Sequence, residues 1–125
     1  MKLRTGLAAH VNLLVEQQDT AVALGSGDVP VLGTPRVVAL AEEATVAAVA
    51  AALPAGRTTV GTRVEVQHRA PTPPGREVEA TAILVGVDGR KLTFDVTVRD
   101  GDEVIATAVV ERVMVDRDRF LAGVR

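Results

Sequence analysis

The chain has 125 residues, of which 47 % are hydrophobic and 24 % charged, and its net charge is −2. This length supports one domain with its own core, which we assign to residues 1–125. The slightly acidic balance, with no basic stripe, argues against a nucleic-acid partner. The sequence contains no cysteine, which excludes disulfides, thiolate metal ligands and a cysteine nucleophile. No apolar run is long enough to span a membrane, so we expect a cytoplasmic protein without a membrane partner.

The first half of the chain predicts one or two strands, a loop and a long helix. Residues 8–24 alternate loosely between apolar and polar positions, and residues 25–30, GSGDVP, are typical of a loop. Thr34 is a suitable N-cap, because Pro35 would then take the first helical position, where its missing N–H costs nothing. Pro and Gly within residues 53–56 end the predicted helix.

After the helix, the hydrophobic period changes from 3.6 to 2. Alternation predicts four further strands, and Asp-Gly pairs at two of the joins favour tight hairpins. The strands are expected over residues 58–69, 76–87, 91–99 and 103–115. We therefore predict an α+β domain in which a curved antiparallel sheet packs against one long helix.

The predicted helix carries two adjacent glutamates, and a helical projection separates them. Glu42 falls inside an apolar stripe that includes Val46, whereas Glu43 falls on the most polar sector. The opposite face is rich in alanine and suits close packing on the sheet. Two apolar faces predict two partners, the sheet and a second subunit. A carboxylate inside such a stripe either has a function or lies at the edge of the helix and reaches water.

His68 is the second unusual polar residue. Counting by twos from Val60 along the strand places His68 on the apolar face, as a functional group or as a core histidine with a satisfied hydrogen bond. One Glu and one His at long spacing do not form a metal-ligand set, so we expect neither a metal nor a cofactor. Phosphate loops and GxSxG nucleophile motifs are absent from the sequence.

Three stretches resemble a known family: VLGTPRVVALAEEA, RTTVGTRVEVQHRAPTPPG and VDGRKLTFDVTVRDGDEVIATAVVERVMVD. Together they are similar to the hotdog-fold thioesterases typified by fluoroacetyl-CoA thioesterase, from residue 31 to about 120. The resemblance implies a catalytic set of Thr34, Glu42 and His68, with Gly61 near the bound acyl thioester. It also implies an acyl-CoA substrate and a homodimer or dimer of dimers. The site would then lie at the subunit interface, where His68 could serve the partner's Glu42.

The implied reaction is thioester hydrolysis. Glu42 would act as nucleophile or general base, and His68 as acid/base or as a hydrogen-bond donor to the substrate. Thr34 would donate its hydroxyl to Glu42 or to the substrate, and free N–H groups at the helix start would hold the oxyanion. Candidate cations for the CoA phosphates are Arg57, Arg63, Arg69 and Arg76, although each is more typical of a solvated surface charge.

The loop that would cover the acyl pocket, residues 19–33, has no bulky residue, and no aromatic residue precedes Phe94. We therefore expect an acyl-CoA thioesterase for short chains rather than one that selects a fluorinated acyl group through an aromatic gate. The alternative is a non-catalytic hotdog protein that binds acyl-CoA or a small molecule. A hotdog hydratase ranks lower, because its DxNPxH-like stretch is missing.

Overall fold

The structure, a computed structural model, describes residues 2–124. It contains five strands, one long helix and several short helical segments. In chain order these are β1 (Ala8–Leu14), η1 (Gln17–Asp19), α1 (Ala21–Leu24), α2 (Thr34–Val49), η2 (Ala50–Ala52), β2 (Arg57–His68), β3 (Glu77–Asp88), β4 (Lys91–Asp100), β5 (Glu103–Asp116) and α3 (Arg117–Ala122).

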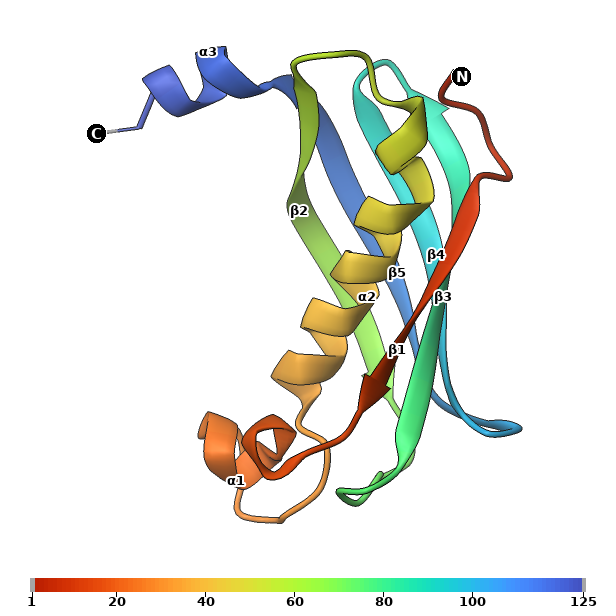
Figure 1. The fold of residues 1–125 in the computed structure, drawn as a ribbon, viewed down its shortest axis with the longest axis vertical. Helices are drawn as coiled ribbons and strands as arrows, with labels where there is room; N and C mark the ends of the chain where they lie inside the picture. Colours follow the sequence, from red (N-terminus) through yellow and green to blue (C-terminus); the bar gives the residue numbers. More distant parts are fainter. Residues whose placement is uncertain (1, 125) are drawn as a thin grey trace.

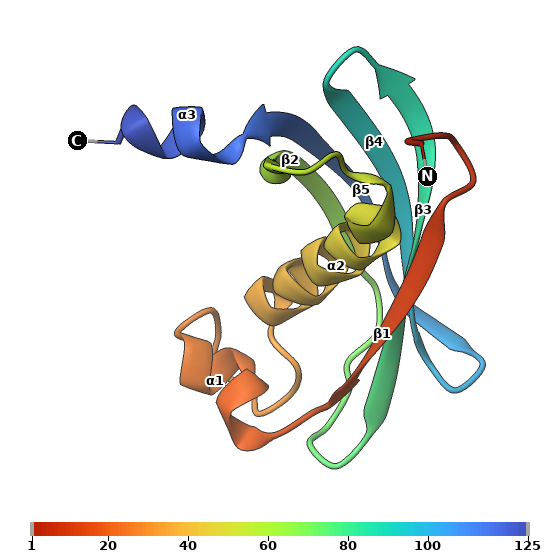
Figure 2. The same cartoon turned by 45° about the horizontal axis from the view of Figure 1, so that its top comes forward.

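The five strands form one antiparallel sheet in the order β1-β3-β4-β5-β2. The sheet curves around α2, which crosses its concave face (Figures 1 and 2). The β3–β4 and β4–β5 hairpins turn at Gly89 and Gly101, both at φ +60°, a conformation that side chains resist and that Asp-Gly turns require. The predicted α+β hotdog arrangement is confirmed, with β1 and β2 as the two edge strands.

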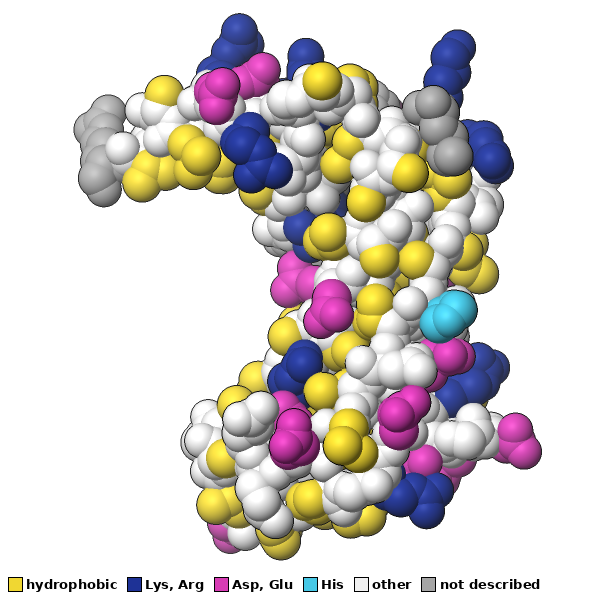
Figure 3. Space-filling view, viewed as in Figure 1, with side chains coloured by type: hydrophobic (Ala, Val, Ile, Leu, Met, Phe, Trp, Pro, Cys, Tyr) yellow, Lys and Arg dark blue, Asp and Glu magenta, His cyan; other side chains and the backbone are white. Residues whose placement is uncertain are grey.

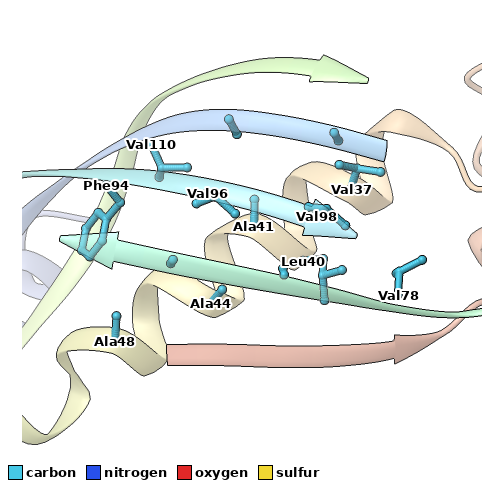
Figure 4. Close-up of a cluster of buried hydrophobic side chains, with 14 of the residues drawn as sticks. Val37, Leu40, Ala41, Ala44, Ala48, Val78, Phe94, Val96, Val98 and Val110 are labelled. Atoms are coloured by element: carbon cyan, nitrogen blue, oxygen red, sulfur yellow. The ribbon is translucent and has the colours of Figure 1, made fainter. Parts of the chain in front are cut away.

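The core lies between α2 and the sheet. The helix buries one face, which includes Leu40, Ala41 and Ala44, against valines of the sheet and Phe94 (Figure 4). Small alanine side chains let the helix sit close to the strands, as the sequence predicted. The second apolar stripe is partly open, since Val46 is exposed.

The β2 strand contains an irregularity that the alternating pattern did not reveal. Its register with β5 shifts between Gly61 and Arg63, so one extra residue interrupts the alternation. Val64 and Val66 pack against the core on the face that His68 shares, but Val60 lies on the opposite face. The predicted common face is therefore wrong for Val60, because counting by twos fails across a bulge.

The two ends of the chain also differ from the sequence prediction. Residues 8–24 form one strand, within the predicted one or two, followed by two short helical turns that were not predicted, and α3 was not predicted either. Within residues 2–124, no helix is both long enough and apolar enough to cross a membrane.

Candidate active site

The start of α2 places Thr34 against the end of β2. The helix is capped by Gly33 rather than by Thr34, so Thr34 is its first residue and Pro35 its second. A Cβ on Gly33 would come within about 3.1 Å of the Ala21 backbone, so this close approach favours glycine. Because Thr34 does not cap the helix, its hydroxyl is free to hydrogen-bond with His68, and the Oγ1–Nδ1 distance is 2.9 Å.

His68 is half-buried, and its two ring nitrogens have different surroundings. Nδ1 meets the Thr34 hydroxyl, whereas Nε2 is buried without a hydrogen-bond partner among the described residues. Burial lowers the pKa of His68 below its ordinary value of 6.5, and the Ala70 backbone partly opposes this shift. The imidazole is therefore neutral at pH 7 and can accept or pass on a proton.

Thr34 and His68 open onto a cavity of about 350 Å³ between the loop before α2 and the end of β2. This volume is at the lower end of the range for small-molecule pockets. None of the lining residues is Phe, Tyr or Trp, which agrees with the predicted absence of a bulky lid. The lining residues are Ala21, residues 26–29, residues 31–34 and residues 68–71.

Glu42 belongs to a second polar cluster, farther along α2. Its Oε2 accepts a hydrogen bond from Nη1 of Arg112 at 3.1 Å. Arg112 also donates from Nε to Thr59 Oγ1 at 2.9 Å and from Nη2 to the Thr59 carbonyl at 3.0 Å. The guanidinium is thus fixed by three hydrogen bonds, and it fixes one carboxylate oxygen in turn.

The two partners of this ion pair differ in exposure. The Arg112 side chain is 8 % exposed, whereas that of Glu42 is 36 % exposed. Burial lowers the pKa of Arg112 from its usual value, and the charge and hydrogen bond of Glu42 oppose the shift. Glu42 is therefore neither a core residue nor a freely solvated one: a buried cation positions it, and part of it faces outward.

The backbone of Gly61 lies next to the Glu42 carboxylate. It pairs with Arg112 across the β2–β5 ladder. A Cβ added to Gly61 would overlap with Oε2 of Glu42, so a bare backbone is needed for the carboxylate to occupy this place.

The structure therefore brings the four predicted residues together in two pairs, Thr34 with His68 and Glu42 with Gly61. Thr34 and Glu42 are eight residues apart, about 12 Å along the helix axis. No hydrogen bond connects the two pairs within the part of the chain that the structure describes. Within this single chain the Thr34 hydroxyl meets His68, and donation by Thr34 to Glu42 or to the substrate stays a prediction.

Arg112 was missed by the sequence analysis. It lies in the apolar run of β5, where its charge resembles an ordinary outward-facing residue beside Glu111. A signal was nevertheless present, because alternation from Val110 places Arg112 on the buried face. Within residues 2–124, no three His, Asp or Glu side chains are grouped closely enough to hold a metal ion.

Comparison with known proteins connects this arrangement to one family. The profile of the FlK family, fluoroacetyl-CoA-specific thioesterase, matches residues 15–118. The fluoroacetyl-CoA thioesterase of Streptantibioticus cattleyicolor is 40 % identical over 95 residues, which cover 76 % of this chain and 68 % of that protein.

Solved structures agree in fold. A structure of the fluoroacetyl-CoA thioesterase FlK has a TM-score of 0.90 at 32 % identity and covers 98 % of this chain and 95 % of its own. A point mutant of FlK in complex with fluoroacetate and CoA has a TM-score of 0.86 at 32 % identity, covering 94 % and 99 %. A Thermus thermophilus thioesterase superfamily member, 24 % identical with a TM-score of 0.88 over 95 % and 88 % of the two chains, shares the fold. The chain therefore belongs to the fluoroacetyl-CoA-specific thioesterase family and is a thioester hydrolase.

Proposed function

We propose that this chain, as one catalytic domain, hydrolyses short-chain acyl-CoA thioesters to the free acid and CoA. The observation that carries the proposal is the Glu42 carboxylate. Its Oε2 is held by a buried Arg112, while Oε1 has no hydrogen-bond partner among residues 2–124 and the side chain stays partly exposed. The Glu42 carboxylate is thus fixed beside Gly61, and one of its oxygens is free. This arrangement suits attack on a bound carbonyl group, directly or through a water molecule.

In the proposed reaction, Glu42 removes a proton from a water molecule while the oxygen of that water molecule bonds to the thioester carbon. The C–S bond then breaks, and the CoA sulfur leaves with the proton that Glu42 took from the water molecule. Attack by the carboxylate itself, followed by water, gives the same products. The Thr34 N–H is suited to stabilising the oxyanion, because Pro35 has no N–H and the N–H groups of Arg36 and Val37 donate to the Gly33 carbonyl.

We assign the Thr34–His68 pair to proton transfer and substrate orientation. In the tautomer that carries its proton on Nε2, Nδ1 of His68 accepts the Thr34 hydroxyl. Because Glu42 of the same chain lies about 12 Å farther along α2, we propose that the Glu42 acting on a carbonyl at this pair comes from the partner subunit.

The size and lining of the cavity support the short-chain assignment. Its volume is about 350 Å³, and no Phe, Tyr or Trp side chain lines it. The name of the curated relative, fluoroacetyl-CoA thioesterase, also indicates a small acyl group on CoA. Without an aromatic gate in the chain's own loop, we propose a substrate range wider than fluoroacetyl-CoA.

We further propose that the working form is a homodimer joined along β2. This 12-residue strand is an edge of the sheet, and an unpaired edge of that length favours pairing with another copy. The molecule is hollowed beside α2 and β2 (Figure 3), where the exposed stripe of α2 would meet the second subunit. Sedimentation should show a dimer at micromolar concentration, and a stable monomer would contradict this assignment.

The pairing indicates which subunit supplies His68. Within one chain, His68 lies seven residues from Gly61 along β2, about 23 Å, and Thr34 lies about 12 Å from Glu42 along α2, so one chain does not bring both pairs to one carbonyl. Antiparallel pairing of two β2 edges turns the His68 end of one strand toward the Gly61 end of the other, so we propose that His68 serves the partner's Glu42. Arg63 and Arg76 are paired with carboxylates, whereas Arg57 and Arg69 make no ion pair within residues 2–124, so these two are the candidates for a CoA phosphate.

Glu42→Gln tests the catalytic role against the binding alternative. The amide is close in shape and can still accept a hydrogen bond from Arg112, but it cannot act as a base or nucleophile. We expect thiol release from acyl-CoA to fall by about a thousandfold, with acyl-CoA binding retained in calorimetry. The matched control is Glu43→Gln, on the exposed side of the same helix turn, which should keep full activity. Equal turnover of the Glu42→Gln variant and the wild type would refute the assignment.

A further inference from the structure

The C-terminal helix α3 leaves the body of the molecule with its apolar side chains exposed. Asp116 caps it through the Arg119 N–H, and the Arg117 N–H donates to the Gly56 carbonyl, but none of its own residues is buried. Phe120 is 47 % exposed and Leu121 is 57 % exposed. Figures 1 and 2 show α3 extending away from the sheet beyond the β2 edge. A six-residue helix has little stability without packing, so this segment indicates a missing contact.

The position of α3 relates it to the free edge of the sheet. A cavity of about 230 Å³ separates α3 from the first residues of β2, and Val60, Phe120 and Leu121 line it. Val60 is the residue that the bulge turns away from the core. The bulge therefore places an apolar side chain beneath α3 at the edge where we propose the second subunit to pair.

The dimer proposed above decides what α3 would meet. When two copies of β2 overlap fully, the N-terminal end of each lies beside the C-terminal end of the other, which carries His68. The α3 helix of one subunit then lies next to the 350 Å³ cavity of the other. Within one chain these two features cannot meet, because α3 and the α1 region lie at opposite ends of the molecule (Figure 1).

We propose that Phe120 and Leu121 of each α3 cover the mouth of the acyl cavity in the partner subunit. They would supply the apolar wall that the loop before α2 lacks, since that loop contributes no aromatic side chain. Phe120 is one of only two aromatic residues in the sequence, and the other, Phe94, is fully buried in the core. This inference rests on the dimer of the proposed function, and it makes Phe120 a determinant of acyl-chain selectivity.

Cross-linking tests the placement independently of activity, because the chain has no cysteine. Leu121→Cys combined with Val29→Cys, in the loop of the cavity, should form covalent dimers when its thiols are oxidised with diamide. The matched control combines Leu121→Cys with Leu14→Cys. Val29 and Leu14 are exposed to a similar extent, 51 % and 53 %, but Leu14 lies on the opposite edge strand.

The expected result is a covalent dimer from the first pair and little from the control. Equal cross-linking of both pairs, or none in a protein that sediments as a dimer, would overturn the placement of α3. A monomer in sedimentation would overturn both the dimer and this inference, whereas loss of thioesterase activity alone would leave the cross-linking result standing.

Phe120→Ala tests the role of the covering residue. We expect KM for acyl-CoA to rise about tenfold while kcat changes little, with the sedimentation coefficient of a dimer retained. Leu14→Ala is the control and should match the wild type. An unchanged KM across acyl chains of different length would show that Phe120 does not cover the cavity.

Discussion

The two polar clusters along α2 use different physical devices. At the start of the helix, Thr34 and His68 share one hydrogen bond between groups that are neutral at pH 7, beside an open cavity. Eight residues later, Glu42 is held by the buried guanidinium of Arg112, which donates three hydrogen bonds in all. The first pair can change its hydrogen bond at little cost, whereas the second is fixed by charge and by the backbone. This difference suits proton transfer at one end and precise positioning of a carboxylate at the other.

The bare backbone at Gly61 is the point where the second cluster is most easily disturbed. Gly61→Ala would push the Glu42 carboxylate from its place, and we expect kcat/KM to fall about a hundredfold through misplacement of the reacting group. The control is Gly86→Ala in β3, where an added Cβ would lie 3.5 Å from the Thr93 Cβ in ordinary contact. Similar activity of both variants would show that the Glu42 position is not critical.

Replacement of the Arg112 guanidinium, which holds Glu42, should affect both stability and activity. Arg112→Lys keeps the charge but cannot reproduce the hydrogen bonds to Thr59 and Glu42 together. We expect the free energy of unfolding in urea to fall by about 2 kcal/mol, because buried partners are left unsatisfied. Arg63→Lys, on the exposed face of β2, is the matched control and should unfold like the wild type.

Loss of the Thr34 hydroxyl, in the cluster at the start of α2, should lower activity less than these changes. Thr34→Val removes the hydrogen bond to His68, and we expect about a tenfold loss of kcat/KM, equivalent to one such bond. Thr34→Ser keeps the hydroxyl and should retain most of the activity. Because Gly33 caps the helix, neither change should lower the melting temperature much. Equal loss in both variants would indicate that the methyl group, and not the hydrogen bond, is important.

The smallest predicted effect concerns the pH dependence of stability. Burial lowers the pKa of folded His68, so the unfolded chain binds more protons near pH 6.5. The contribution of His68 to stability is therefore full above pH 6.5 and decreases as the pH falls through that value, until the lowered pKa is passed. Urea unfolding of His68→Gln between about pH 5 and 8 should show a weaker acid-side decrease than the wild type. The control is His10→Gln, which removes the other histidine. The difference in pH-dependent stability between the two variants gives the contribution of His68.

Most of the fold follows from local patterns. The 3.6-residue period of α2 and the alternation in β2 to β5 both reflect burial of one face. Apolar residues therefore recur at every third or fourth position in the helix and at every second position in the strands. The short α3 carries no such pattern, because none of its residues is buried. The bulge at Gly61–Arg63 was also unpredictable from alternation, which assumes that no extra residue interrupts the ladder.

The site was predicted in part, for a similar reason. Glu42 and His68 were visible because each breaks an apolar pattern on its own element. Their contacts join residues 34 to 70 positions apart, and no local pattern encodes these. The cap at Gly33, which frees the Thr34 hydroxyl, depends on close packing against α1 and so appears only in three dimensions.

The central claim is that this chain hydrolyses acyl-CoA thioesters in an open cavity of modest size. The most direct test is thiol release by the wild-type protein from a panel of acyl-CoAs of increasing chain length, followed with a chromogenic thiol reagent. We predict turnover of acetyl-CoA and other short-chain thioesters that declines as the acyl chain outgrows the cavity. No thiol release from any member of the panel, by a protein that is folded and dimeric, would contradict the account.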